Sequence, residues 1–161
     1  MICPYCGYDD QIVINKRETD KNTRNWRRRR CTKCFRIFTT YEGVDLNFII
    51  VIKQNGKRVR YKREKMYAGI YHAFYRIKSS DSGNAASIAD SITNKIENKL
   101  MLAQTKEITT EELRYLIASC ILQENFNAGL NYISYFFKPK SFFDLTRYEK
   151  KIKKIREMYS Q

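Results

Sequence analysis

The chain has 161 residues, a length that fits one ordinary domain or two small ones, and its 43% hydrophobic content is enough for a buried core and excludes a disordered tail. Its 31 basic against 17 acidic residues give a net charge of +14, which points to a polyanionic partner, nucleic acid before membrane. A solvated lysine-rich surface is the alternative, and charge alone does not separate the two. No run of 18 apolar residues could span a bilayer, and cysteines stand where a signal peptide would have its apolar core, so we expect a soluble, cytoplasmic protein without a membrane partner.

Four of the five cysteines form two Cys-x-x-Cys pairs, Cys3 with Cys6 and Cys31 with Cys34, separated by 24 residues. This spacing lets two knuckles place four thiolates around one Zn²⁺ ion, and such a closed shell is structural because it leaves no position for water. A redox pair and a rubredoxin-like iron site are the alternatives. The arginine run beside the second pair does not suit an electron-transfer domain. We therefore expect structural zinc, which supplies the folding energy that a segment of about 40 residues lacks.

The residues between and after the cysteine pairs predict a small antiparallel sheet. Strands are expected at 11–14, 26–30 and 37–41, because these runs are rich in β-branched or aromatic side chains or lead directly into the second knuckle. Residues 20–23 are typical of a turn. We expect residues 1–45 to fold as a zinc ribbon.

Four consecutive arginines, 27–30, immediately precede Cys31. Successive side chains of a strand point to opposite faces, so a thin ribbon would present arginines on both sides. Guanidinium groups suit phosphate oxygens and the O6/N7 edge of guanine, and a two-stranded ribbon fits the major groove. A solvated charge run is the alternative, but like charges repel each other within a minimal fold. We expect nucleic-acid binding, through bases or through the backbone alone. The neighbouring basic residues are Arg17, Arg24, Lys33 and Arg36.

The second part of the chain predicts a hairpin on a small helical bundle, which makes the whole chain α+β. A buried strand is expected at 48–52, a turn at 54–57 and a returning strand at 58–61. Helical spacing of apolar residues, with a cap at Thr109 or Thr110, then predicts four helices. Their expected bounds are 63–77, 85–102, 109 or 110 to about 124, and 128–137.

Basic residues are dense on this hairpin and the first turn of the next helix. They could bind nucleotide phosphates, or they could be a solvated surface or a further DNA contact. The chain has neither a GxxxxGK[ST] nor a GxGxxG motif, which excludes a P-loop and a Rossmann site. The basic residues are Lys53, Lys57, Arg58, Arg60, Lys62, Arg63 and Lys65.

Taken together, the cysteine spacing, the arginine run, the segment 38–42 and the pattern from Val51 through Asn55-Gly56 to Lys65 resemble the NrdR family, bacterial repressors of ribonucleotide reductase genes. The family joins a zinc ribbon to an ATP-cone, and the likeness runs from Met1 to about Phe143. The segment from Ala128 to Phe136 is similar to the last cone helix of the family.

The resemblance implies a ribbon at 1–45 that binds double-stranded operator DNA, and a cone at 46–140 that senses ATP against dATP. In the family the bound nucleotide changes the oligomeric state and so the operator affinity, which implies a homo-oligomeric, nucleoid-associated protein with ATP or dATP as effector. The implied DNA contacts are Arg17, Arg27, Arg28, Arg29, Arg30, Lys33, Arg36 and Thr39. The implied nucleotide contacts are Val51, Ile52, Lys53, Gln54, Arg60 and Lys65, with both lysines on phosphates.

The chain departs from the family pattern at several positions of both parts. An alternative is therefore a ribbon that binds RNA or DNA beside a cone used only for oligomerisation. An enzyme is excluded, because a reductase would need a large catalytic barrel and redox cysteines, and only Cys120 remains outside the zinc set. The departures are Asn15, Lys16, Phe35 and Ile37 in the ribbon, and Gln54, Val59, Gly129 and Asn131 in the cone.

Residues 141–161 predict a basic amphipathic helix. Its apolar residues are spaced three and four apart, and lysines flank them. The seam could pack on the bundle of its own chain or pair with another subunit. We expect Cys120 to be a core residue and His72 to be structural. The seam residues are Leu145, Tyr148, Ile152, Ile155 and Tyr159.

Overall fold

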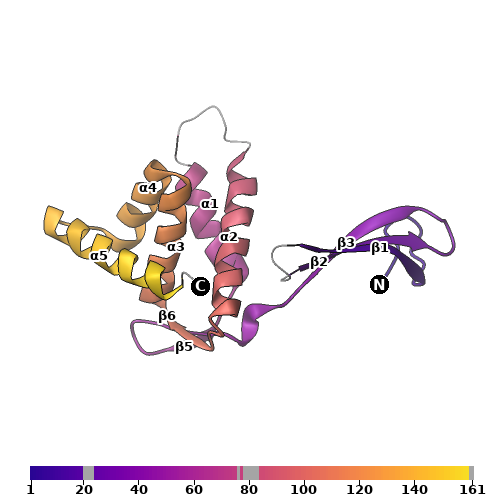
Figure 1. Cartoon of the computed structure of the whole chain (residues 1–161), viewed down its shortest axis with the longest axis horizontal. Coiled ribbons are helices and arrows are strands. Elements are labelled where there is room, and N and C mark those ends of the chain that lie inside the picture. The colour runs from indigo at the N-terminus through magenta and orange to yellow at the C-terminus, as the bar shows by residue number, and fades with distance from the viewer. Residues whose placement is uncertain (20–23, 76, 78–83, 160–161) are drawn as a thin grey trace. The chain divides into compact units, whose positions relative to one another are not determined.

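The computed structural model describes residues 1–19, 24–75, 77 and 84–159. It divides into two compact units, Met1–Asp45, here called the ribbon unit, and Leu46–Gln161, here called the helical unit (Figure 1). The expected turn at 20–23 lies outside the described residues. Within the described part of the chain, no helix is both long and apolar enough to cross a membrane.

The ribbon unit is a three-stranded antiparallel sheet with the order β1-β2-β3 (Figure 1). Its strands are β1 (Gln11–Thr19), β2 (Arg24–Cys31) and β3 (Ile37–Gly43). β1 continues well past its expected end at residue 14, because β2 pairs with it as far as Thr19 through a bulge between Val13 and Asn15. The arginine-rich strand is the central one, so both of its edges are hydrogen-bonded.

The helical unit begins with a small mixed sheet of order β5-β4-β6. The strands of this sheet are β4 (Ile50–Ile52), β5 (Arg58–Arg60) and β6 (Glu107–Thr109), and a 3₁₀ turn (Leu46–Phe48) precedes β4. The expected strand at 48–52 is wrong at its start, because Phe48 lies in the 3₁₀ turn and exposes 55% of its surface. The hairpin turn is confirmed, with Gly56 at φ +77° and the Lys53 N–H donating to the Lys57 carbonyl at 2.9 Å. The sequence did not indicate β6, which pairs parallel to β4.

Five helices complete the described part of the helical unit, and capping side chains set several of their starts. Thr109 and Glu112 form a capping box at the start of α3, as expected. The Asn125 side chain accepts a hydrogen bond from the Ala128 N–H at 2.9 Å, which starts α4 two residues earlier than expected. The helices are α1 (Arg63–Tyr75), α2 (Ala85–Leu102), α3 (Thr110–Glu124), α4 (Phe126–Phe137) and α5 (Phe142–Met158).

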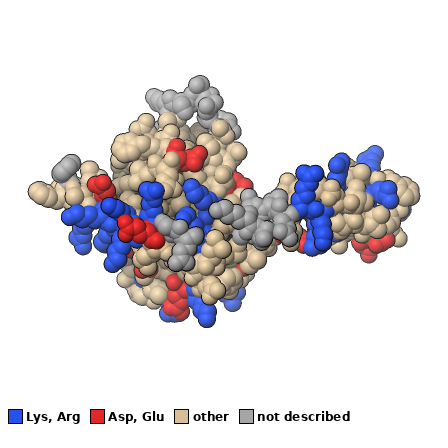
Figure 2. Space-filling model, viewed as in Figure 1, with Lys and Arg blue, Asp and Glu red and all other residues tan. Residues whose placement is uncertain are grey.

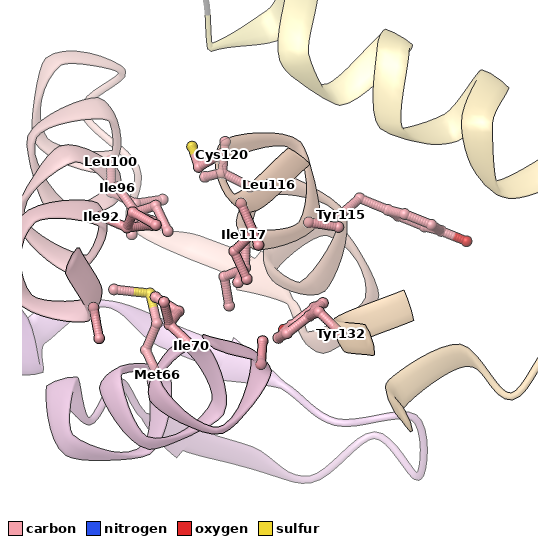
Figure 3. Packing of buried hydrophobic residues seen from close by; sticks show 14 of the residues in the cluster. Met66, Ile70, Ile92, Ile96, Leu100, Tyr115, Leu116, Ile117, Cys120 and Tyr132 are labelled. Atoms are coloured by element: carbon pink, nitrogen blue, oxygen red, sulfur yellow. The ribbon is translucent and has the colours of Figure 1, made fainter. Parts of the chain in front are cut away.

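The core of the helical unit is built around α3. Ile92, Ile96 and Leu100, one turn apart on α2, point toward Ile117 of α3, and Ile70 of α1 closes the cluster from below (Figure 3). Ile70, Ile96 and Leu100 are fully buried. This regular spacing explains why the bounds of α2 agree with the expectation to the residue.

Helix α5 packs on the bundle of its own chain, so the first of the two alternatives for its seam is confirmed. Ile152 and Ile155 join the core, and the Tyr148 hydroxyl donates to the Phe137 carbonyl at 3.2 Å. The Lys151 ammonium lies 2.5 Å from a carboxylate oxygen of Glu111 on α3. Cys120 is 2% exposed, which confirms it as a core residue.

Candidate metal centre, basic sheet and cleft

The four cysteines of the two pairs meet at one end of the ribbon unit. Their Sγ atoms all lie within 4.8 Å of one another, with Cys3 Sγ 3.7 Å from Cys34 Sγ and Cys6 Sγ 3.6 Å from Cys31 Sγ. A tetrahedron with Zn–S bonds of about 2.3 Å requires S···S separations of about 3.8 Å. The donor set is therefore compatible with zinc in both chemistry and spacing.

The two knuckles share one backbone conformation. The Gly7 N–H donates to the Cys3 carbonyl at 3.0 Å, and the Phe35 N–H donates to the Cys31 carbonyl at 3.1 Å. Gly7 has φ +72° and Phe35 has φ +60°. Glycine adopts this left-handed conformation without strain, whereas a side chain with a Cβ does so at a cost, so Phe35 is a strained position at the second knuckle.

The thiols of the cluster differ in their readiness to ionise. The backbone N–H of Cys34, followed by that of Lys33, lowers the pKa of the Cys31 thiol to about 7. The Tyr8 N–H favours the Cys6 thiolate, but burial and hydrogen bonds with the other three thiols outweigh it and raise the pKa of Cys6 to about 12. Four crowded thiols can all lose their protons only if a cation neutralises them, which a divalent metal would do.

The arginine run divides between the two faces of the sheet, and one face is occupied by ion pairs. The Arg29 guanidinium donates from Nε to Thr40 Oγ1 at 3.0 Å and lies 3.0 Å from Glu42 Oε1. Arg27 Nη1 lies 3.1 Å from the same carboxylate oxygen. Only 14% of the Arg29 side chain is exposed, so its charge is committed within the sheet.

Arg28 and Arg30 lie on the opposite face and are exposed. The strand register places Arg28 between Asn15 of β1 and Thr39 of β3, and it places Arg30 beside Ile37 of β3. Thr39 is exposed as well. The face that carries Arg28, Arg30 and Thr39 is here called the open face of the sheet. Because Arg28 and Arg30 are exposed on it, their guanidinium groups are accessible to a ligand.

Three other basic residues of the ribbon lie over aromatic rings, which the sequence did not indicate. Each pair combines a cation with a flat apolar surface, with the charged group 5.2 to 5.7 Å from the ring centroid. Figure 2 shows blue basic side chains along the ribbon unit. The pairs are Arg17 over Trp26, Lys33 over Tyr8 and Arg36 over Tyr5.

The helical unit has a cleft of about 320 Å³ between α1 and α4. Its volume is at the lower end of the range found for small-molecule sites. Lys65 supplies a cation and exposed His72 supplies an imidazole, whereas α4 contributes aromatic rings and the amide of Asn131. The residues that line the cleft are Lys65, Ala68, Gly69, His72, Ala73, Asn131, Tyr132, Tyr135 and Phe136.

Of the six residues expected to contact a nucleotide, Lys65 lines this cleft and the other five do not. Val51 is 6% exposed in the core of the helical unit, at the centre of its sheet. Ile52 lies on the same strand, Lys53 and Gln54 follow in the turn, and Arg60 ends β5. The sequence analysis did not predict the aromatic wall of the cleft. The pattern that could have indicated it is the spacing of Tyr132, Tyr135 and Phe136, which puts the three rings on one face of α4.

Two basic residues of the hairpin region are held within the helical unit. Arg58 pairs with Glu107 on β6. Arg63 pairs with Glu97 and lies 2.6 Å from Asp90, both on α2. These contacts tie the hairpin and α1 to neighbouring elements and leave Lys53, Lys57, Arg60, Lys62 and Lys65 as the other cations of this region.

Two departures in α4 have different surroundings. Gly129 faces α3, and a Cβ built there would lie 2.3 Å from Leu122 Cδ2 and 3.1 Å from Leu122 Cα, so this helix crossing leaves no room for a side chain. Asn131 lines the cleft, and its amide donates to the Ala73 carbonyl at 3.4 Å, near the carboxyl end of α1.

Comparison with known proteins agrees with this architecture in both parts of the chain. Residues 1–42 match the family described as transcriptional repressor NrdR-like, N-terminal domain, and residues 49–141 match the ATP cone domain. The chain is 33% identical over 156 residues to transcriptional repressor NrdR of Caldanaerobacter subterraneus subsp. tengcongensis, covering 96% of this chain and 93% of that protein. It is also 33% identical to transcriptional repressor NrdR of Nitrosomonas europaea, covering 96% of this chain and 92% of that protein. It is 37% identical over 117 residues to the protein of that name from Acetivibrio thermocellus, covering 73% of this chain and 74% of that protein. The expected zinc ribbon, ATP-cone and non-enzymatic role are thereby confirmed, and the chain belongs to the NrdR family of transcriptional repressors.

Proposed function

We propose that this protein is a zinc-dependent repressor that binds promoter DNA of ribonucleotide reductase genes and responds to ATP or dATP. The observation that carries the proposal is the four-cysteine cluster at the end of a strand whose exposed arginines lie on one open face. Residues 1–45 would bind DNA, 46–140 would bind nucleotide and mediate homo-oligomerisation, and 141–161 would support the cone. Such a repressor acts in the cytoplasm, at the nucleoid.

Zinc bound by Cys3, Cys6, Cys31 and Cys34 would hold the two knuckles together and so fix the end of β2. Arg28 and Arg30 on the open face would then meet phosphate oxygens or the O6/N7 edge of guanine. The remaining proposed contacts are Arg17, Arg27, Arg29, Lys33, Arg36 and Thr39. Among these, Arg27 and Arg29 would act mainly by shaping the sheet, because both are paired with Glu42.

Fluorescence anisotropy with labelled promoter DNA tests the ribbon. Arg28→Ala and Arg30→Ala should each weaken binding and reduce the slope of log K against log salt by about 0.9, the value for one lost phosphate contact. Arg29→Ala is the matched comparison, and it should mainly lower the stability of the ribbon. Removal of zinc by a chelator should abolish binding. Operator binding that survives zinc removal, or that ignores Arg28 and Arg30, would contradict the proposal.

The nucleotide half of the proposal is supported by the cleft between α1 and α4. Lys65 lines this cleft and could hold a phosphate, and the aromatic residues of α4 could stack on a base. The proposed contacts Val51, Ile52, Lys53, Gln54 and Arg60 lie outside this cleft and would need a ligand that extends toward the hairpin. A nucleotide can switch the repressor only if it binds the DNA-competent assembly with a different affinity.

Calorimetric titration with ATP and with dATP, together with native mass spectrometry, tests this half. We expect at least one nucleotide to bind and to shift the distribution of oligomers, and we expect Lys65→Gln to weaken that binding at least tenfold. If neither nucleotide binds at millimolar concentration, the sensing proposal fails. The second candidate, a cone that only oligomerises, would then stand, and the Asn131 amide committed to Ala73 favours it.

A further inference from the structure

Helix α5 is fixed to the helical unit by one side only. Ile152 and Ile155 are 8% and 7% exposed against the bundle, and Lys151 is paired with Glu111 of α3. The Lys99 ammonium of α2 donates to the Tyr159 carbonyl at the end of the helix. The apolar side of α5 is therefore already used for packing, and the orientation of its opposite side is set.

The opposite side of α5 carries a row of exposed basic residues. Arg147, Lys150 and Lys154 follow one another at spacings of three and four, which places them along one stripe about 10 Å long, and Lys153 flanks it. These four residues are here called the basic face of α5. Figure 2 shows blue side chains gathered on the part of the helical unit where Figure 1 places α5.

Contacts among the described residues account for only part of this basic face: Lys151, helped by the charge of Arg147, lowers the pKa of Glu111 on α3, and three lysines are left over. Lys150, Lys153 and Lys154 form no salt bridge with any residue that the structure describes. The helix contains six basic and three acidic residues, and Glu111 of α3 pairs with one more base, so a net charge of +2 is left over. Like charges at i and i+4, as at Lys150 and Lys154, destabilise a helix by a small amount, and an external polyanion would relieve that repulsion.

We propose that the basic face of α5 is a second DNA-binding surface, which contacts the phosphate backbone of duplex DNA without reading its sequence. This proposal rests on the proposed DNA-binding function of the ribbon. Duplex DNA has one negative charge for about every 1.7 Å of its axis, so a stripe of three or four cations can meet several phosphates at once. Lysine ammonium groups are point charges that hold phosphates without base selectivity, so the surface adds affinity and leaves operator choice to the ribbon.

A membrane surface is the less suitable partner for the same helix. Amphipathic helices that lie on membranes bury an apolar face among the lipid chains while basic residues meet the headgroups. In α5 the residues that would insert, Ile152 and Ile155, are already buried against the bundle. Phe143 and Met158, which are 84% and 58% exposed, lie near the two ends of the helix, so they form no continuous apolar face and cannot replace them.

The test compares two triple variants of the full chain in a salt series with duplex DNA that lacks an operator. In the first variant Lys150, Lys153 and Lys154 are replaced by Gln, which has a helix propensity close to that of Lys. In the second the same lysines are replaced by Arg, which keeps the charge. The Gln variant should bind at least tenfold more weakly at physiological salt and lose between one and about 2.7 units of the salt slope, whereas the Arg variant should match the wild type.

Each other outcome decides between the alternatives. If the wild type binds DNA and the Gln variant keeps its affinity and slope, the role of α5 is overturned while the function of the ribbon stands. If the wild type binds no duplex DNA, the proposed function itself fails. Sedimentation with phosphatidylglycerol vesicles and titration with single-stranded RNA complete the comparison. A Gln variant that loses vesicle or RNA binding but keeps DNA binding would overturn the proposal in favour of that partner.

Discussion

The ribbon unit and the helical unit differ in what they bury when they fold. In the ribbon unit the only buried residues among those described are Cys3 and Cys31, and both belong to the four-cysteine cluster. The helical unit buries a continuous apolar core from all five helices and its sheet. We therefore expect the first unit to draw its free energy of folding from a bound ion, whereas the second draws it from apolar burial.

The largest expected effect comes from breaking the metal centre. Cys31→Ser should unfold the ribbon unit and leave the helical unit folded, because zinc contributes roughly 10 kcal/mol or more to the folding of such domains. Trp26, the single tryptophan, reports on the ribbon by fluorescence, and far-ultraviolet circular dichroism reports on the helices. Cys120→Ala is the matched control in the helical unit and should leave the Trp26 signal unchanged. Loss of both signals in Cys31→Ser would show that the two units fold as one.

The packing of the helical unit can be tested with two glycines. Gly129→Ala should destabilise the helical unit by about 1–3 kcal/mol, because its Cβ would meet the side chain and the Cα of Leu122. Gly69→Ala is the matched comparison, and it should be neutral or stabilise by up to about 1 kcal/mol. Its Cβ would lie 3.4 Å from Phe136, an ordinary contact, and alanine has the higher helix propensity. Denaturant unfolding followed by circular dichroism measures both, and equal effects would contradict this account of the helix crossing.

At one backbone position of the ribbon unit, a substitution should raise the stability of the fold rather than lower it. Phe35→Gly should stabilise the ribbon unit by about 1 kcal/mol, because it removes a Cβ from a residue with φ +60°. Gly7→Ala at the equivalent position of the first knuckle, where φ is +72°, should destabilise it by a similar amount. Thermal unfolding followed by Trp26 fluorescence measures both changes. A Phe35→Gly variant that melts earlier than the wild type would show that the Phe35 side chain makes a stabilising contact which outweighs its strain.

The smallest expected effect is a pH dependence of the contact between α3 and α5. The Lys151 ammonium, which hydrogen-bonds the carboxylate, lowers the pKa of Glu111 from its ordinary value against the opposing effect of burial, and the Tyr115 hydroxyl assists it. A lowered pKa in the folded state contributes stability above the unfolded pKa, and this stability is lost as the pH falls through the folded value. Both side chains are more than a third exposed, so we expect only a few tenths of a kcal/mol.

Acid titration of the free energy of unfolding, in the wild type and in Lys151→Gln, tests this dependence. The wild type should be slightly more stable at neutral pH, and the difference should disappear in acid once Glu111 is protonated. Lys154→Gln, on the basic face, is the matched control and should show no such pH-dependent difference. A difference for Lys151→Gln that grows as the pH falls would have the wrong sign for this pair.

Much of the fold could be predicted because it is encoded by local patterns. The bounds of α2 follow from apolar residues at helical spacing, and the capping box of α3 follows from Thr109 and Glu112 three residues apart. Strand β6 escaped prediction because it has three residues and exists through parallel pairing with β4, more than fifty positions earlier. The start of the strand at 48–52 was wrong because the apolar run includes Phe48, which the 3₁₀ turn leaves exposed.

The four cysteines and their spacing by themselves determined the donor set of the candidate metal centre, because each Cys-x-x-Cys pair presents two thiolates from one tight turn. The pairing of β1 with β2 then brings the two turns to one end of the ribbon unit. The order of the cysteine pairs before the cone pattern also determined the family. Only the tertiary structure decided which arginines are accessible. Alternation along β2 puts neighbouring arginines on opposite faces of the sheet, but it does not reveal that Glu42 of β3 pairs with Arg27 and Arg29 on one of those faces. The tertiary structure likewise decided that the apolar side of α5 packs against the bundle and that Lys150, Lys153 and Lys154 are exposed. Contacts between distant segments settle such questions, and no local pattern contains them.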